Sequence, residues 1–352
     1  MGRGTLLRAF IKIRGNKGDT LNIRKPIVGI TMGDPAGIGP EITVKAIASP
    51  EIQEVCRPMI IGDARVAQNA LETAKIDLPI RMISSVRGAG GDTAAIRIFD
   101  TRNADPKKIA AGQPSALGGK AVFGDIQRAV QLAQEKKISG IVAGPHNKYS
   151  VNLAGIPFAG YPPLIAQLTG SRYAFNMLVS GSIRVVGATL HLALKDVCRV
   201  ISKDLVLATI EAVQTALNRL QVQHPRIAVA GLNPHCGEEG LFGTEEETVI
   251  GPAIEAAQKQ GIQASGPYPA DSLFVGLKEP PAFDAYVAMY HDQSHIPIKT
   301  VAFESIAGLI IGTPLVIATV GHGTAFEIAG KGQANPRPMM ETIRLVARSC
   351  NR

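Results

Sequence analysis

Three segments of the chain combine glycine with side chains that can hold a cation or exchange a proton. They are MGDPAGIGPE (32–41), MYHDQSHIPIK (289–299) and GHGTAFEIAGKGQANP (321–336). Histidine binds metals and acts as an acid or base near neutral pH, and glycine lets the backbone approach a ligand closely. Residues of these types are typical of an enzyme site that holds a nucleotide beside a polar substrate.

The C-terminal segment is the most specific of the three. Thr324 and Asn335 offer neutral hydrogen bonds, and Glu327 can meet ribose hydroxyls. In the N-terminal segment, Gly33, Gly37 and Gly39 do not form the GxGxxG pattern of a Rossmann dinucleotide site. That segment predicts a tight loop at the start of a helix, which either binds an anion or only turns the chain.

The bulk composition excludes several classes of protein. The chain has 352 residues, 45% of them hydrophobic and 19% charged, which is enough for two lobes with a large core. Residues 1–25 carry seven basic side chains against one acid and so hold most of the net charge of +8; we predict a basic, disordered extension there and no nucleic-acid partner. No apolar run approaches about 18 residues, which argues against a membrane span. The four cysteines form no CxxC pair, which favours the cytoplasm.

Strands and helices alternate along the chain. Short β-branched runs occupy 27–31, 59–63, 140–144, 184–191, 226–233 and 285–292. Between the fourth and fifth runs, apolar residues recur at helical spacing after Ser202, a predicted N-cap. This alternation predicts an α/β fold with a mostly parallel sheet and helices on both faces.

Polar side chains follow the predicted strands at their C-terminal ends, where ligands bind in such sheets. They are Asp34, His146, Lys148, His191, Asn233, His235, His291 and Asp292. Because the ends of parallel strands share one edge of a sheet, we expect several of these side chains to meet there.

The C-terminal segment resembles the adenosine-binding segment of the isocitrate and isopropylmalate dehydrogenases, which bind nicotinamide cofactors without a Rossmann fingerprint. The other motifs narrow the resemblance to the 4-hydroxythreonine-4-phosphate dehydrogenase (PdxA) family. Beyond the three segments above, its patterns match AGIPFAGYPPL (154–164), TLHLAL (189–194), GLNPHCGEEGLFGTEE (231–246) and GPYPADSLF (266–274). The matches run in order over nearly the whole chain from Pro26 onward.

The resemblance implies a two-lobed fold like that of the isocitrate and isopropylmalate dehydrogenases, with NAD or NADP as cofactor. We predict a first lobe of residues 26–135 plus 300–352, with the nucleotide-binding loop. The second lobe, 136–299, would carry the metal ligands and the interface of a homodimer that shares its active site. The family binds a divalent metal (Zn²⁺, Mg²⁺, Mn²⁺ or Co²⁺) through three histidines, two of which align with His191 and His291.

Four departures from the family pattern bear on the substrate. The third metal histidine is replaced by Tyr161, so that the third ligand is open, with His146 and His295 as alternatives. The family's phosphate-binding asparagine and arginine align with Gly308 and Ile317, and Gly321 replaces an aspartate. Since a phosphate dianion needs charged partners, these losses predict a non-phosphorylated substrate. The replacements look similar to the branch that oxidises the cis-dihydrodiol of terephthalate; the phosphorylated hydroxythreonine, or a related phosphorylated sugar acid, is the alternative.

The resemblance also implies a role for each site residue. His291, Asp271 and Lys299 would be catalytic, with Lys299 predicted to be buried among apolar neighbours and Asp271 either a base or a helix N-cap. The substrate would contact His146, Asn147, Lys148 and Tyr161. The cofactor would contact Asn233, His235, His322, Gly323, Thr324, Ala325, Glu327 and Asn335, although His322 can equally brace its own loop.

The predicted reaction moves hydride from a secondary alcohol to NAD⁺ or NADP⁺ and then releases CO₂, with the metal near His191 and His291 polarising the ketone. A small carboxylate is the predicted substrate. Two rival classes stay open: an acyltransferase, because phosphate acetyltransferases share a related fold, and a binding protein that has lost catalysis.

Overall fold

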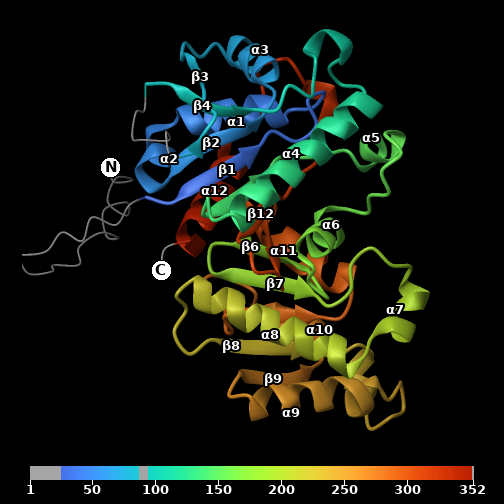
Figure 1. Cartoon of the computed structure of the whole chain (residues 1–352). Coiled ribbons are helices and arrows are strands. Elements are labelled where there is room, and N and C mark those ends of the chain that lie inside the picture. The colour runs from blue at the N-terminus through green and yellow to red at the C-terminus, as the bar shows by residue number, and fades with distance from the viewer. Residues whose placement is uncertain (1–24, 87–93, 351–352) are drawn as a thin grey trace, which may run out of the picture.

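The structure of the chain is a computed structural model that describes residues 25–86 and 94–350. Within these residues twelve strands form one sheet in the order β3-β4-β2-β1-β5-β12-β11-β6-β7-β10-β8-β9 (Figure 1). The strands are β1 Ile27–Thr31, β2 Arg57–Gly62, β3 Ile80–Met82, β4 Ile96–Asp100, β5 Gly140–Ala143, β6 Phe175–Ser180, β7 Ile183–Gly187, β8 Arg226–Ala230, β9 Gln263–Tyr268, β10 Ala285–Ala288, β11 Ala307–Ile311 and β12 Ile317–Val320.

Helices cover both faces of this sheet. They are α1 Gly39–Ala48, α2 Pro50–Val55, α3 Ala64–Ala74, α4 Ala116–Gln134, α5 Lys148–Leu153, α6 Tyr161–Thr169, α7 Leu194–Val200, α8 Lys203–Arg219, α9 Gly251–Lys259, α10 Ala270–Leu273, α11 His291–Ala302 and α12 Arg337–Cys350. One large core cluster joins α1, α3, α8, α9 and α12 to one face. On the other face, α4 and α6 pack over the first half of the sheet and α11 over the second half. The predicted α/β class with helices on both faces is confirmed.

The strand directions divide the sheet into two parallel blocks. The first six strands in the sheet order run parallel, and so do β7, β10, β8 and β9. Between the blocks, β11 is antiparallel to β12 and β6, and β6 is antiparallel to β7. A flat sheet of this order would place the C-terminal ends of β5 and β7 at opposite edges.

The twist of the sheet brings the two blocks' C-terminal ends together. Neighbouring strands rotate by about 20–25°, so the steps from β5 to β7 add up to roughly a right angle. In Figure 1 the arrowheads of β7 and β8 and the helices α5, α6 and α7 all lie on the right-hand side. The loops that follow β5 and β7 therefore reach the same space.

All six predicted strands occur; two end one residue earlier than predicted, and three end three or four residues earlier. The fourth ends at Gly187, the fifth at Ala230 and the sixth at Ala288. The prediction that His291 ends a strand was wrong, because His291 begins α11. Ser202 caps α8 as predicted, its side chain accepting a hydrogen bond from Leu205 N at 3.3 Å.

Three further predictions concern the lobe boundary, the N-terminal extension and membrane spans. β5 lies between β1 and β12, inside the first parallel block, although the predicted lobe boundary at residue 136 assigns it to the second lobe. The basic extension at 1–25 falls almost entirely outside the described residues. Among the helices that the structure describes, none combines the length and apolar character needed to cross a membrane.

Candidate active site

His191 and His291 face each other across the C-terminal ends of β7 and β10. Their ring centres lie 5.9 Å apart. β7 and β10 are parallel neighbours, and their following loops stay joined because Thr189 donates to the carbonyl oxygen of Met289 through both its backbone N–H (3.1 Å) and its hydroxyl (2.8 Å). The sheet thus holds the two imidazoles together, although 100 residues separate them in the chain.

Lys148, from the first turn of α5, reaches the same place. Its Nζ lies 3.3 Å from His191 Nε2. An ammonium can only donate, so this nitrogen of His191 carries a lone pair and the ring is neutral. The pKa of His191 is lowered by burial, by Lys148 and by His291, and burial also lowers the pKa of Lys148.

Helix α11 presents a row of polar side chains beside this pair. His291, His295 and Lys299 follow one another at intervals of four residues and therefore lie on one face. The rings of His291 and His295 stack with centres 3.9 Å apart. Burial lowers the pKa of His295 to about 4. Lys299 is exposed and lines a shallow groove with the two histidines, so the prediction that it is buried among apolar neighbours was wrong.

The two facing imidazoles fit a divalent metal. His291 Nδ1 lies 2.6 Å from Asp292 Oδ1, so the ring donates there and leaves Nε2 as the lone pair. In His191 the lone pair already faces the Lys148 cation. A metal bound at about 2.0–2.1 Å from each nitrogen would hold the ring centres roughly 5–6 Å apart, as they are here. In residues 25–86 and 94–350, however, no three His, Cys, Asp or Glu side chains are placed to hold one ion.

Tyr161 lies in an aromatic cluster next to the histidine pair. Its side chain is 2% exposed, and its hydroxyl donates to the carbonyl oxygen of Gly144 at 3.1 Å. His146 packs edge-on against Tyr161 (4.3 Å) and Phe158 (5.0 Å), and burial, followed by the charge of Lys148, lowers its pKa to about 4. Tyr161 therefore offers almost no surface to a substrate in this structure.

Asn147 and Ile317 also make contacts that stabilise the fold. The Asn147 side chain caps α5 by accepting from Ser150 N at 2.9 Å. Ile317 lies in the apolar cluster that includes Tyr161. The substrate roles of His146, Asn147, Lys148 and Tyr161 stay predictions.

The two glycine-rich segments of the sequence lie against each other. The N–H of Ile38 donates to Thr324 O at 2.9 Å, and a Cβ added at Gly37 would come within 2.8 Å of the same oxygen. Helix α1 holds the C-terminal segment as well, since Glu41 Oε1 accepts from Ala334 N at 2.8 Å. Lys45 Nζ donates to Gly332 O and Ala334 O. The loop after β1 therefore braces the predicted cofactor segment.

Of the residues in this segment predicted to contact the cofactor, Gly323, Glu327 and Asn335 are exposed. Thr324 is buried, and His322 Nδ1 lies 2.9 Å from Gly323 O, which favours the loop-bracing alternative for this histidine. Beside the segment is a pocket of mixed character, lined by apolar residues such as Pro35, Val66 and Ile109 and by the polar side chains of Glu41, Asn69 and Thr73. Gly330 is the residue of the segment that lines this pocket, and the contact of Glu327 with a ribose stays a prediction.

Asn233 brings its amide to acidic residues of its own loop. Its Nδ2 lies 2.7 Å from Glu245 Oε2 and 2.9 Å from Glu246 Oε2. Glu246 is buried and also accepts the backbone N–H groups of Leu232 and Asn233 at 2.7 Å. These bonds hold a loop in which residues 235–240 all have left-handed φ, a conformation that is costly for non-glycine residues.

His235 and Asp271 lie apart from the histidine pair. His235 is exposed and its Nδ1 lies 3.1 Å from Glu238 Oε2. Asp271 belongs to α10, where its charge is close enough to Cys236 to raise the pKa of that thiol, after burial and Glu246. Its side chain caps no helix in the structure, and its catalytic role stays a prediction.

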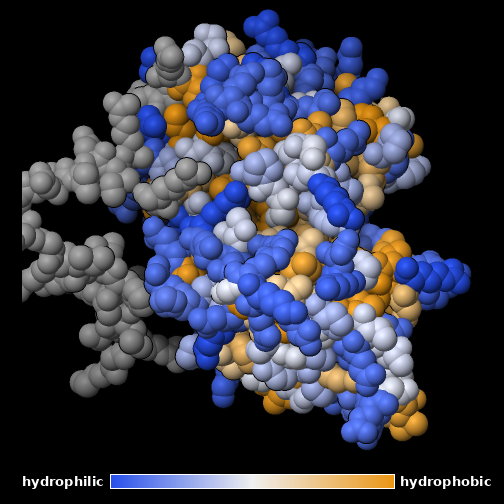
Figure 2. All heavy atoms as spheres, turned by 60° about the horizontal axis from the view of Figure 1, so that its bottom comes forward, coloured by the Kyte–Doolittle hydropathy of each residue, from blue (hydrophilic) through white to orange (hydrophobic). Residues whose placement is uncertain are grey.

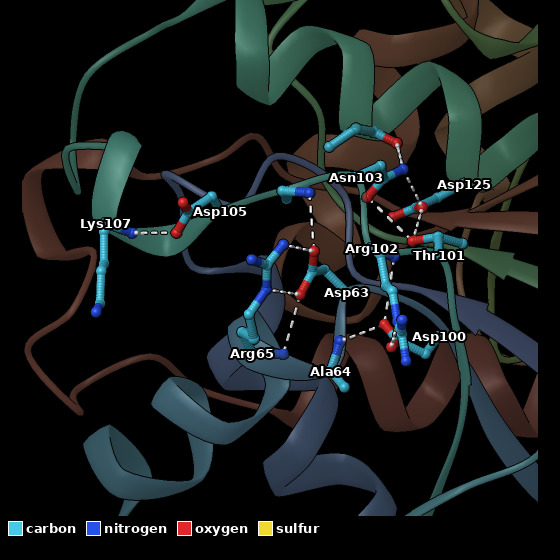
Figure 3. Close-up of polar contacts among 12 residues, drawn as sticks. Asp63, Ala64, Arg65, Asp100, Thr101, Arg102, Asn103, Asp105, Lys107 and Asp125 are labelled. Carbon is cyan, nitrogen blue, oxygen red and sulfur yellow. Dashed lines mark hydrogen bonds and ion pairs between the residues drawn. The ribbon is translucent and has the colours of Figure 1, made fainter.

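A second polar cluster, which sequence patterns did not reveal, lies at the C-terminal ends of β2 and β4 (Figure 3). Asp125 of α4 is 3% exposed and accepts hydrogen bonds from Thr101 Oγ1 (2.9 Å) and Asn103 Nδ2 (2.8 Å). Asp63 is held by Arg65 through its side chain at 2.7 and 2.9 Å and by Ala104 N at 2.9 Å. Burial raises the pKa of Asp125 to about 7.

Comparison with known proteins gives consistent similarities. The profile described as "Pyridoxal phosphate biosynthetic protein PdxA" matches residues 54–346. A protein of Symbiobacterium thermophilum, named putative D-threonate 4-phosphate dehydrogenase, is 41% identical over 92% of this chain and 96% of its own length.

Two solved structures with the same fold are named for different activities. The 4-hydroxythreonine-4-phosphate dehydrogenase of Burkholderia phymatum is 39% identical, with a TM-score of 0.81 over 93% of this chain and 99% of its own. The terephthalate 1,2-cis-dihydrodiol dehydrogenase of Burkholderia xenovorans LB400 is 33% identical, with a TM-score of 0.67 over 92% of this chain and 98% of its own.

Proposed function

The chain belongs to the PdxA family of dehydrogenases, and from that premise we propose that it oxidises a secondary alcohol of a phosphorylated hydroxy acid such as D-threonate 4-phosphate. The observation that carries this proposal is the pairing of two lysines with the facing imidazoles. Lys148 touches His191, and Lys299 lines the groove of His291. Two cations beside the reacting centre suit a substrate with two anionic groups, since hydrogen bonds between charged partners are the strong ones.

This proposal reverses the order of the two substrates predicted from sequence. The relatives named for phosphorylated substrates are 41% and 39% identical to the chain, whereas the terephthalate dihydrodiol enzyme is 33% identical and superposes less well. The dihydrodiol stays the second candidate because of one observation: Ile317 and Tyr161 lie in an apolar cluster and offer no charge to a phosphate.

The roles of the side chains follow from their geometry. A bound nicotinamide supplies the hydride acceptor, and a bound divalent metal supplies a Lewis acid for the developing carbonyl. His191 and His291 would hold such a metal through Nε2, the ring nitrogen that the contacts of each ring leave unprotonated. Lys148 Nζ can take the hydroxyl proton only after it releases one of its own, and burial favours that release by lowering its pKa. Lys299 Nζ would bind an anionic group of the substrate, and loss of CO₂ would follow if the oxidised carbon lies next to the carbon that bears the carboxylate.

We also propose a homodimer that completes this site. Large apolar side chains are exposed around it, and apolar atoms gather on the right of Figure 2, the side on which α5 and α7 lie. They are Tyr149, Leu153, Leu192, Leu194, Ile296 and Phe303, between 44% and 71% exposed. Exposed apolar surface of this kind marks an interface, and a partner subunit could supply the third metal ligand. Leu194→Glu should yield monomers by light scattering and lose activity, whereas an active monomer would refute the shared site.

A direct assay tests the proposed function. Purified chain supplied with Zn²⁺, Mg²⁺, Mn²⁺ or Co²⁺ should reduce NAD⁺ or NADP⁺ with D-threonate 4-phosphate or 4-hydroxythreonine 4-phosphate. The cis-dihydrodiol of terephthalate should give a kcat/KM lower by at least tenfold; the opposite order would establish the second candidate.

Two control measurements complete the assay. His291→Ala should abolish turnover and weaken metal binding measured by calorimetry, while His322→Ala, on the cofactor loop, should leave metal binding unchanged. Thermal stability should rise with NAD⁺ or NADP⁺ and not with coenzyme A. Stabilisation by coenzyme A alone would favour an acyltransferase, and absence of any metal or nucleotide binding would favour a protein that has lost catalysis.

A further inference from the structure

Asn176, on the interior strand β6, has an amide without a protein partner. Its neighbours Phe175 and Met177 point into the large core cluster on the other face of the sheet. Asn176 Oδ1 is buried with no hydrogen-bond partner. Its Nδ2 makes no hydrogen bond with any residue in 25–86 or 94–350 either, although the side chain is half-buried. Buried polar groups are nearly always paired, so an unpaired amide here calls for a functional explanation.

Two glycines flank this amide on the same face of the sheet. One residue beyond the Met177–Val186 pair, Asn176 lies opposite Gly187 of β7. On the other side, Asn176 pairs with Ile310, two residues from Gly308 of β11. A Cβ added at Gly308 would lie 2.6 Å from Asn176 Oδ1. The absence of a side chain at 308 therefore makes the room that the amide occupies.

The amide lies on the face of the sheet that α11 covers. Helix α11 packs over β6 and β7, and a Cβ at Gly187 would come within 3.1 Å of Ser294 Oγ. That hydroxyl is itself 2.9 Å from His295 Nδ1. On the other side, Ile310 belongs to the cluster of Tyr161. Asn176 thus lies between the histidine groove of α11 and the Tyr161 cluster.

We propose that Asn176 is a substrate-binding residue that donates through Nδ2 to an oxyanion of the substrate. Because Oδ1 faces the Cα of Gly308, the two N–H bonds of Nδ2 are the part of the amide left for a ligand. Their natural partner is an oxygen that only accepts, as in a phosphate or carboxylate group. The inference rests on the proposed function in placing the substrate in this groove, and it adds a residue that neither charge nor motif identified.

Two substitutions separate binding from folding. Asn176→Leu keeps the size of the side chain and removes the unpaired amide, so the protein should melt at or above the wild-type temperature while its affinity for the ligand falls at least tenfold. Asn176→Asp places a carboxylate against the oxyanion and should weaken binding further. Ser180→Ala is the matched control from the same strand and face, because its hydroxyl is occupied by Ser305 Oγ at 2.7 Å. It should bind within twofold of wild type.

Calorimetric titrations with three ligands identify the source of the oxyanion. D-threonate 4-phosphate and inorganic phosphate should both lose affinity in Asn176→Leu if the amide binds the phosphate. If the amide instead binds the carboxylate of an aromatic substrate, terephthalate should be the one ligand whose affinity falls. Affinity for NAD⁺ or NADP⁺ should not change in either variant. A folded Asn176→Leu or Asn176→Asp protein that binds all three ligands as the wild type does would overturn the assignment.

The same titrations distinguish this inference from the proposed function. Suppose the wild type turns over none of the substrates but binds phosphate or terephthalate, and this binding depends on Asn176. The proposed function is then refuted, and the binding role of Asn176 is supported. If the wild type oxidises its substrate and Asn176→Leu does so with an unchanged KM, the binding role of Asn176 is refuted and the proposed function is supported. Wild-type protein that binds none of the three ligands at millimolar concentration would overturn the assignment of Asn176 as well.

Discussion

Asp125 should make the stability of this protein depend on pH near neutrality. Its carboxylate is 3% exposed, and within residues 25–86 and 94–350 its hydrogen-bond donors are the neutral groups of Thr101 and Asn103 (Figure 3). Burial, reinforced by the nearby charge of Asp63, raises its pKa from 3.8 to about 7. The folded protein therefore holds a proton on Asp125 that the unfolded chain releases near pH 4.

The sign and size of the effect follow from this difference. A carboxyl whose pKa is higher in the folded state loses stability as the pH rises from its unfolded pKa to its folded pKa. A shift of roughly three pKa units corresponds to about 4 kcal/mol in total. Roughly 3 kcal/mol of this falls between pH 5 and pH 8. Asp125→Asn cannot ionise and still accepts both hydrogen bonds through its carbonyl oxygen, so it should lack this part of the pH dependence.

Urea unfolding at pH 5, 6, 7 and 8 tests the prediction. The free energy of unfolding of Asp125→Asn minus that of wild type should increase by about 3 kcal/mol from pH 5 to pH 8. Any constant change in packing cancels in this comparison. Asp63→Asn is a second test: it removes the charge that reinforces the raised pKa of Asp125, so this variant should lose less stability from pH 5 to pH 8 than the wild type does. A difference for Asp125→Asn that stays flat across this range would refute the reasoning.

The remaining predictions concern the site itself. Lys148→Met should raise the pKa of His191 in an NMR titration, because a cation 3.3 Å away disfavours the imidazolium. Lys195 is exposed on α7, so the control Lys195→Met should leave the pKa of His191 unchanged. An unchanged pKa in Lys148→Met would contradict the contact. Tyr161→Phe should lower the free energy of unfolding by about 1 kcal/mol through loss of the bond to Gly144 O. Tyr161→His should destabilise the fold and leave metal affinity unchanged; tighter metal binding would show that the ring reaches the ion.

Much of the fold could be predicted from the sequence because its strands are buried on both faces. β1, β5, β8 and β10 are continuous runs of small and β-branched residues, and each was predicted. β4, which reads IRIFD, alternates polar and apolar residues, and β9 contains Gly266 and Pro267, so neither has that signature. β11 and β12 belong to one apolar stretch interrupted by Gly312, Thr313 and Pro314, and neither strand was predicted. Their antiparallel placement depends on pairing with β6, which no local pattern encodes.

The candidate site was predictable where it depends on strand ends. His191 and His291 follow parallel neighbours, so their meeting follows from topology once the sheet order is known. The solvent exposure of Lys299 was not predictable in this way, because it depends on α11 beginning at His291 and placing the lysine on its solvent side. The burial of Asp125 was not predictable for a related reason. It depends on the packing of α4 against the sheet, and a lone aspartate on a helix has no sequence signature.

The position 308 shows how a substitution can mislead when a strand is considered alone. The resemblance assigns a phosphate-binding asparagine to this position, and the glycine there supported a substrate without phosphate. In the sheet, the space above Gly308 is filled by the amide of Asn176 from the adjacent strand. Neighbours on one face of adjacent strands lie within reach of one another's side chains, so β6 can supply a donor that β11 lacks. The glycine at 308 alone therefore does not argue against an oxyanion here, and the loss of the arginine that aligns with Ile317 is what still supports a non-phosphorylated substrate.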